Sequence, residues 1–111
     1  MTLCEIFNTC KNHLLTQNKK SLDEEGRCKY RGKDNCKCAI GIFIPDDEYN
    51  PEFDADCGLT LHKLHTPTIE KIFNTSKKLI LGKRLQAIHD NYPVNEWPRI
   101  LDKESLNYKT V

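Results

Sequence analysis

The residues best able to do chemistry in this chain are six cysteines and four histidines. Several of them offer the soft ligands that bind a tetrahedral zinc ion: Cys28, Cys36, Cys38 and Cys57, with His62 and His65 in an H-x-x-H pair. Their spacing is not that of a zinc knuckle, because the cysteine pairs read C-x7-C and C-x-C rather than C-x-x-C. The alternative is that Cys10, Cys38 and Cys57 are small core residues, as free cysteines often are. We expect no metal and no cofactor. If zinc is bound, its ligands are Cys28, Cys36, Cys38 and Cys57.

Catalysis has a weaker basis in the sequence. A cysteine beside a histidine can act as nucleophile and base, and the candidate histidines are His13, His62, His65 and His89. Such pairs arise by chance in a chain with this many cysteines and histidines. The sequence has no glycine-rich phosphate loop, nucleophile elbow or H-E-x-x-H motif. We therefore expect binding without turnover.

The turn "YRGK" carries groups that bind a planar, anionic ligand such as a nucleotide. It combines an aromatic ring, a guanidinium and a glycine that lets a ligand approach the backbone. The candidate ligand-binding residues are Tyr30, Arg31, Gly32, Lys33, Lys37 and Tyr49. The alternative is a solvated hairpin whose basic side chains pair with those of an acidic turn, namely Asp46, Asp47 and Glu48.

Charge is balanced over the chain and polarised in its middle third. Seventeen basic and sixteen acidic residues give a net charge of +1, which provides no global attraction for nucleic acid or for a membrane surface. Residues 27–37 hold five basic residues and one acid, whereas residues 46–56 hold six acids and no base. We expect no membrane partner and no general nucleic-acid binding.

Length and composition predict one domain spanning residues 1–111. With 38% hydrophobic and 30% charged residues in 111 positions, the chain can bury a single modest core. Its longest apolar run, around residues 39–44, is far shorter than the roughly twenty residues that span a bilayer. The first fifteen residues do not have the pattern of a secretory signal. We expect a cytoplasmic protein with reduced cysteines.

The elements that must position these residues are mostly helical. Apolar periodicity and capping residues predict helices over residues 2–17, 67–74, 77–92 and 95–107. The turn formers in "RGKDN" predict a short hairpin, and its second arm leads into a buried strand or helical turn in "CAIGIFI". The predicted fold is a mainly helical α+β domain with a small central β-hairpin, in which "CAIGIFI" forms the middle of the core.

Three stretches also resemble a known group of proteins. "CKYRG", "KCAIGIFIPDDEYNP" and "LQAIHDNY" followed by a tryptophan occur in this order, and in this the chain is similar to a family of small proteins of tailed bacteriophages and prophages. The resemblance covers most of the length and brings no established activity, so it assigns no catalytic residue. Cys36 and Cys57 fall outside the shared pattern. The resemblance implies a phage setting in the cytoplasm of a bacterial host.

Together these observations favour a phage counter-defence protein that sequesters a nucleotide-derived host immune signal without cleaving it. A small chain has little concave surface, so we expect a homo-oligomer with the site near a subunit interface. The first alternative is an inhibitor that binds a host enzyme or defence effector through an apolar patch exposing Trp97 or Phe53. The second is a small phosphodiesterase-like enzyme that degrades such a signal.

Overall fold

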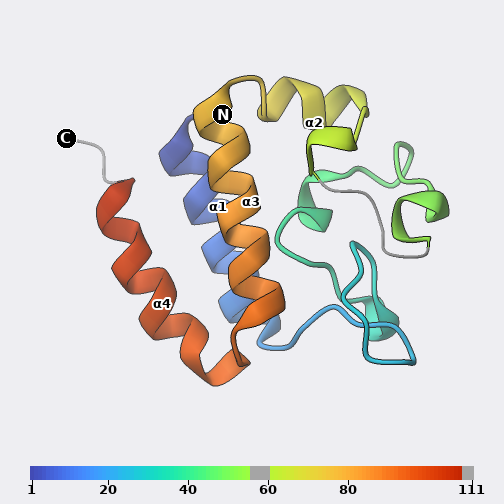
Figure 1. Ribbon diagram of the computed structural model, residues 1–111, viewed down its shortest axis with the longest axis horizontal. Helices are drawn as coiled ribbons and strands as arrows, with labels where there is room; N and C mark the ends of the chain where they lie inside the picture. Colours follow the sequence, from blue (N-terminus) through green and yellow to red (C-terminus); the bar gives the residue numbers. More distant parts are fainter. Residues whose placement is uncertain (56–60, 109–111) are drawn as a thin grey trace.

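The structure, a computed structural model, describes residues 1–55 and 61–108 except for the side chain of His62. In these residues the chain forms four α-helices joined by irregular segments and short 3-10 turns. The helices are α1 (Leu3–Gln17), α2 (Pro67–Ile72), α3 (Ser76–Asn91) and α4 (Trp97–Glu104). Figure 1 shows α1, α3 and α4 side by side, with the segment between α1 and α2 on the side of α3 away from α4. None of the helices in the described ranges is both long enough and apolar enough to cross a membrane.

Helix α1 begins and ends where its sequence predicts. The Thr2 hydroxyl accepts from the backbone N–H of Glu5 (3.1 Å), and the Glu5 carboxylate accepts from the N–H of Thr2 (2.8 Å), which forms a capping box. Asn18 ends the helix in the left-handed conformation, with φ of 53°. The apolar face buries Ile6, Phe7, Cys10 and Leu14. The predicted helix over residues 2–17 is confirmed.

The C-terminal half also follows its sequence pattern. Thr75 caps α3 through a hydrogen bond from Lys78 N–H to its hydroxyl (3.2 Å), and the helix ends shortly before Pro93. Helix α4 is shorter than predicted, because 3-10 turns at Val94–Glu96 and Ser105–Asn107 precede and follow it. Helix α2 is six residues long and stops at Ile72, two residues before the predicted end.

The predicted central β-hairpin, and with it the α+β class, is wrong. The described residues contain two isolated bridges, Leu22 with Cys28 and Arg31 with Lys37, and no strand. The tight turn itself does form. Its two central residues adopt the left-handed conformation, Asp34 with φ of 58° and Asn35 with φ of 61°.

The second arm of the turn becomes helical because of a close backbone contact. Residues Gly41–Phe43 form a 3-10 turn rather than a strand. A Cβ atom on Gly41 would overlap the carbonyl oxygen of Tyr30, so only glycine allows the two backbones to lie this close. The segment still occupies the middle of the core as predicted: Cys38, Ala39, Ile40, Phe43 and Ile44 are buried.

Side chains of the helices replace the missing strand hydrogen bonds in this middle segment. Three of its backbone N–H groups donate to helix side chains: Lys37 to Gln17 Oε1 (2.9 Å), Ile40 to Gln86 Oε1 (3.2 Å) and Ser21 to His89 Nε2 (2.9 Å). These bonds satisfy backbone groups that would otherwise be buried without a partner. They tie the irregular segment to α1 and α3.

Candidate functional site

The predicted ligand-binding turn is held largely by contacts within the protein. The Arg31 guanidinium lies over the ring of Tyr49, 4.3 Å from its centre. Its Nη2 atom donates to the Asp46 carboxylate (2.7 Å) and to the carbonyl oxygen of Ile44 (3.1 Å). The predicted pairing of this turn with the acidic turn is thus confirmed for Asp46, whose side chain is 87% exposed.

Asp54 fixes the backbone of the same turn, although the predicted ligand-binding residues do not include it. Its carboxylate accepts from the N–H of Tyr30 (2.7 Å), from the N–H of Arg31 (3.2 Å) and from the hydroxyl of Tyr49 (2.6 Å). Burial, together with the hydrogen bond to Asp54, raises the pKa of Tyr49 well above its usual range. One carboxylate thus sets the path of the turn and the position of the ring on which Arg31 stacks.

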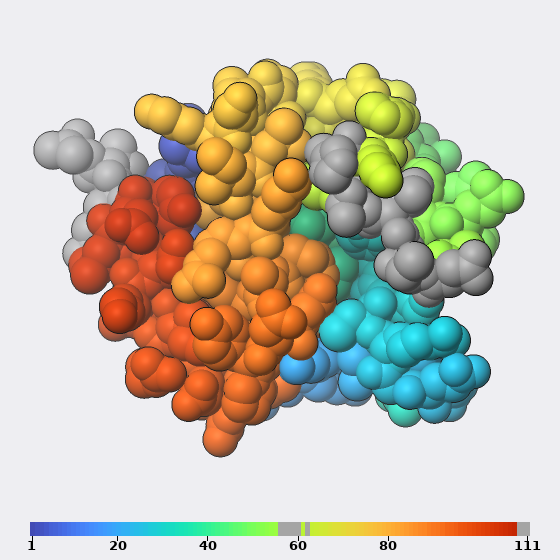
Figure 2. All heavy atoms as spheres, viewed as in Figure 1, coloured from blue at the N-terminus to red at the C-terminus, as the bar shows by residue number. Residues whose placement is uncertain are grey.

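The other predicted ligand-binding residues contribute unequally to the surface. Tyr30 is buried, and a Cβ atom on Gly32 would lie 2.5 Å from the backbone nitrogen of Leu22, so both residues serve packing. Lys33 is exposed, and Lys37 is half-buried opposite Arg31 in the bridge. In the space-filling view the residues of this turn, in cyan, lie at the edge of the molecule away from α4 (Figure 2). Arg31 and Tyr49 are the predicted residues brought into direct contact.

A second cluster joins a cysteine, a histidine and an aspartate at the C-terminal end of α3. In the described ranges, the one group of three side chains close enough to share a metal ion is Cys28, His89 and Asp90, whose ligand atoms lie within 4.8 Å of one another. Of the predicted zinc ligands it contains Cys28 but neither Cys36 nor Cys38. Cys57 and the side chain of His62 lie outside the described residues.

The hydrogen bonds of His89 argue against a metal in this cluster. Its Nε2 accepts from the backbone N–H of Ser21 (2.9 Å), so the proton of the neutral ring lies on Nδ1 and is donated to Asp90 Oδ1 (2.7 Å). A neutral imidazole has one lone pair for a ligand, and here Ser21 already uses it. The ring is fully buried and stacks on Trp97. We conclude that these residues fit a structural network better than a metal centre.

The same bonds disfavour nucleophilic catalysis by Cys28. Partial burial, and after it the nearby Asp90 carboxylate, raise the pKa of the Cys28 thiol to about 11, so the reactive thiolate is scarce at neutral pH. His89 cannot take the thiol proton, because its only lone pair faces Ser21. Cys10 and Cys38, in the core, likewise have raised pKa values because they are buried.

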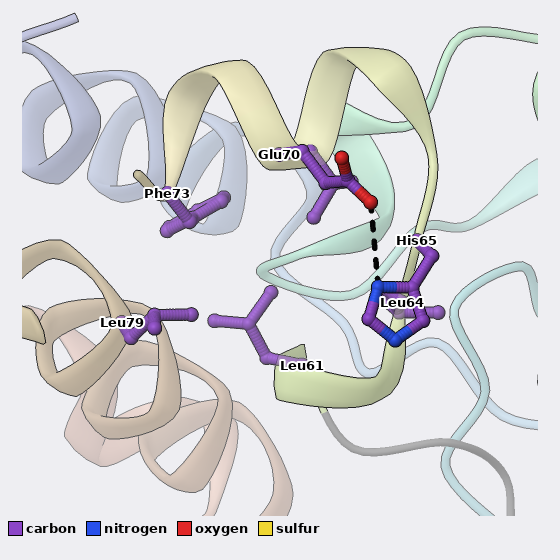
Figure 3. A pocket seen from close by; sticks show the side chains of 7 residues that line it. Leu61, Leu64, His65, Glu70, Phe73 and Leu79 are labelled. Atoms are coloured by element: carbon purple, nitrogen blue, oxygen red, sulfur yellow. Dashed lines mark hydrogen bonds and ion pairs between the residues drawn. The ribbon is translucent and has the colours of Figure 1, made fainter. Parts of the chain in front are cut away.

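A small surface pocket lies where α2 and the turn before it meet the start of α3 (Figure 3). It is lined mainly by apolar side chains: Leu61, Leu64, His65, Ile69, Glu70, Phe73 and Leu79. Figure 3 shows Leu61 and Leu79 pointing toward one another. His65 and Glu70 are joined by a dashed line, with Nδ1 and Oε1 3.3 Å apart. Its volume of about 140 Å³ is close to that of an apolar cavity that holds one benzene ring, about 150 Å³. The pocket can therefore accept a single apolar side chain or small ring.

Trp97 does not form the exposed apolar patch predicted for a protein-binding protein. The Trp97 side chain is fully buried, and its indole N–H donates to the carbonyl oxygen of Tyr92 (3.2 Å). Phe53 is half-buried, edge-on to Tyr49. The sequence did not indicate the pocket, because its apolar residues have the spacing of ordinary core residues.

Comparison with protein-family models, with curated proteins and with solved structures found no significant match to this chain.

Proposed function

We propose that this chain is a phage accessory protein that binds a host protein and inhibits it by occupying a surface, without turning over a substrate. The observation that carries this proposal is the apolar pocket between α2 and α3. Protein interfaces gain most of their affinity from a few large side chains that enter such pockets. The phage setting comes from the sequence resemblance described above.

The size of the pocket favours a protein partner over a nucleotide. Pockets for drug-sized ligands and cofactors have volumes of about 300–1,000 Å³, and this one has about 140 Å³. One leucine, methionine or phenylalanine side chain of a partner would fill it. The remaining contacts of such a complex would come from the surrounding surface.

A matched pair of variants tests the proposal. Leu79→Gln removes an apolar wall of the pocket, while Ile80→Gln makes the same change one residue later, at a side chain that is 65% exposed and does not line the pocket. The full-length protein and each variant are immobilised and exposed to lysate of a bacterial host, and bound proteins are quantified by mass spectrometry. We expect a host protein that is captured by wild type and by Ile80→Gln and is reduced at least tenfold by Leu79→Gln. Equal capture by both variants, or no capture by wild type, contradicts the proposal.

Sequestration of a nucleotide-derived immune signal is the second candidate, and one observation favours it. The Arg31 guanidinium is stacked on Tyr49 and pairs with an exposed carboxylate, that of Asp46, which a ligand phosphate could replace. Calorimetry with cyclic dinucleotides, cyclic trinucleotides and cyclic ADP-ribose isomers tests this candidate. Asp46→Ala should then strengthen binding and Arg31→Ala should weaken it at least tenfold. If none of these ligands binds wild type or Asp46→Ala, the candidate is rejected.

A further inference from the structure

We propose that the partner segment that enters the pocket carries acidic residues on either side of its large apolar side chain. This inference rests on the proposed function, because it specifies the chemistry of the partner at the same pocket. It follows from three lysines near the pocket, which form no ion pair with a carboxylate among the described residues.

Helix geometry places two lysines beside the pocket. Lys83 is one turn after the lining residue Leu79 on α3, so the two side chains share a face of the helix. Lys78 is one turn before Gly82, so these two residues also share a face of the helix. Gly82 lies against the wall of the pocket, because a Cβ atom on it would overlap the Leu61 side chain. The lysines therefore lie on the part of α3 that turns toward the pocket.

A third lysine belongs to the turn that forms the opposite wall of the pocket. Lys63 belongs to the 3-10 turn Leu61–Lys63, which runs directly into Leu64, and its side chain is exposed. Its neighbours Leu61 and Leu64 both line the pocket. Cationic side chains thus border the pocket on α3 and on the turn before α2.

These three lysines form no ion pair with any carboxylate among the described residues. The ammonium of Lys78 donates to a neutral acceptor, Asn74 Oδ1 (3.2 Å). Two carboxylates lie nearby and keep their negative charge, because they are hydrogen-bonded and not paired with a lysine or arginine. Glu70 lines the pocket and contacts His65, and Glu48 accepts from the N–H and the hydroxyl of Thr68 at 2.8 and 2.6 Å. Among these five residues, three lysines against two carboxylates leave an excess of positive charge around the pocket.

An apolar pocket bordered by unpaired lysines selects against a basic partner as well as for an acidic one. Aspartate or glutamate flanking the apolar side chain would pair with the lysines as that side chain is buried, and lysine or arginine there would be repelled. Pairs at the exposed border of an interface act largely on the association rate and are screened by salt.

A random twelve-residue peptide display library, selected on the full-length protein, tests this inference. The strongest peptides are synthesised and their affinity is measured by fluorescence anisotropy for wild type, for Leu79→Gln and for two double charge reversals. One reversal, Lys78→Glu with Lys83→Glu, changes the border of the pocket. The other, Lys33→Glu with Lys103→Glu, makes the same change in net charge at exposed lysines in the turn and on α4.

We expect selected peptides in which one large apolar residue is flanked by aspartate or glutamate. Their binding should be lost in Leu79→Gln, weakened about tenfold or more by the reversal at the pocket, and weakened much less by the distant reversal. Peptides that depend on Leu79 but show no acidic excess and bind both reversals equally would overturn the inference and leave the proposed function standing. If no selected peptide depends on Leu79, both are overturned.

Discussion

Replacing Asp54 by alanine tests whether one carboxylate organises the turn that contains Arg31. The substitution removes the acceptor for the N–H groups of Tyr30 and Arg31 and for the hydroxyl of Tyr49. The two N–H groups are partly buried, so solvent only partly replaces the lost acceptor.

The size of the loss follows from the hydrogen bonds that are removed. A hydrogen bond to a charged group contributes about 1.5–3 kcal/mol, but three bonds to one partly exposed carboxylate are not additive. We expect the free energy of unfolding to fall by about 3 kcal/mol, a large part of the roughly 5–15 kcal/mol that stabilises a domain. At about 2.1 cal/mol/K of unfolding entropy per residue, this corresponds to a decrease in Tm of about 13 °C for 111 residues.

Thermal unfolding followed by circular dichroism provides the assay. Asp47→Ala is the matched control, because Asp47 is an exposed carboxylate of the neighbouring turn and forms no hydrogen bond or ion pair with another described residue. Tyr49→Phe, which removes one of the three donors, should lower the stability by about 1 kcal/mol. If Asp54→Ala unfolds within about 3 °C of Asp47→Ala, the carboxylate does not organise the turn and our reasoning about this site is wrong.

Three further perturbations follow from contacts described above. Gly41→Ala should destabilise the protein by about 3 kcal/mol or more in urea unfolding, because its Cβ atom would overlap the carbonyl oxygen of Tyr30; a loss below about 1 kcal/mol would contradict this. Burial lowers the pKa of His13 from 6.5, so the unfolded chain binds a proton that the folded protein does not. The free energy of unfolding should therefore decrease as pH falls below about 6.5, and His13→Gln should reduce this dependence; an unchanged pH dependence would refute it. Because the pKa of Cys28 is raised to about 11, iodoacetamide should label this thiol slowly at pH 8 and faster in Asp90→Asn, and equal rates would exclude the proposed effect of Asp90.

The helices could be predicted because their signals are local. The capping box of Thr2 and Glu5, and the apolar residues three and four positions apart, lie within the helices they specify. The signal for the tight turn at Asp34 and Asn35 is also local, because the turn formers are the residues of the turn itself. The hairpin prediction failed because its second arm depends on a contact between Gly41 and Tyr30, which no local pattern reveals.

The candidate sites depend even more on distant contacts. Asp54 lies more than twenty residues from Tyr30 and Arg31, whose N–H groups donate to its carboxylate. Nothing in its neighbours distinguishes it from the other acids of that segment. The types of the aromatic and basic residues near Arg31 can be read from the sequence. Which of them are buried cannot be predicted from it. Whether Leu61 and Leu79 close against one another or leave a pocket depends on how three elements pack, and residue spacing carries no information about that.

The bonds from helix side chains to the irregular middle segment have a consequence for hydrogen exchange. Amides outside regular secondary structure usually exchange with solvent through small local openings. Here the N–H groups of Lys37, Ile40 and Ser21 donate to side chains of α1 and α3, so opening of the segment must also break its contacts with the helices. Those three amides would exchange as slowly as the amides inside α3, and the middle third would unfold together with the helices as one cooperative unit.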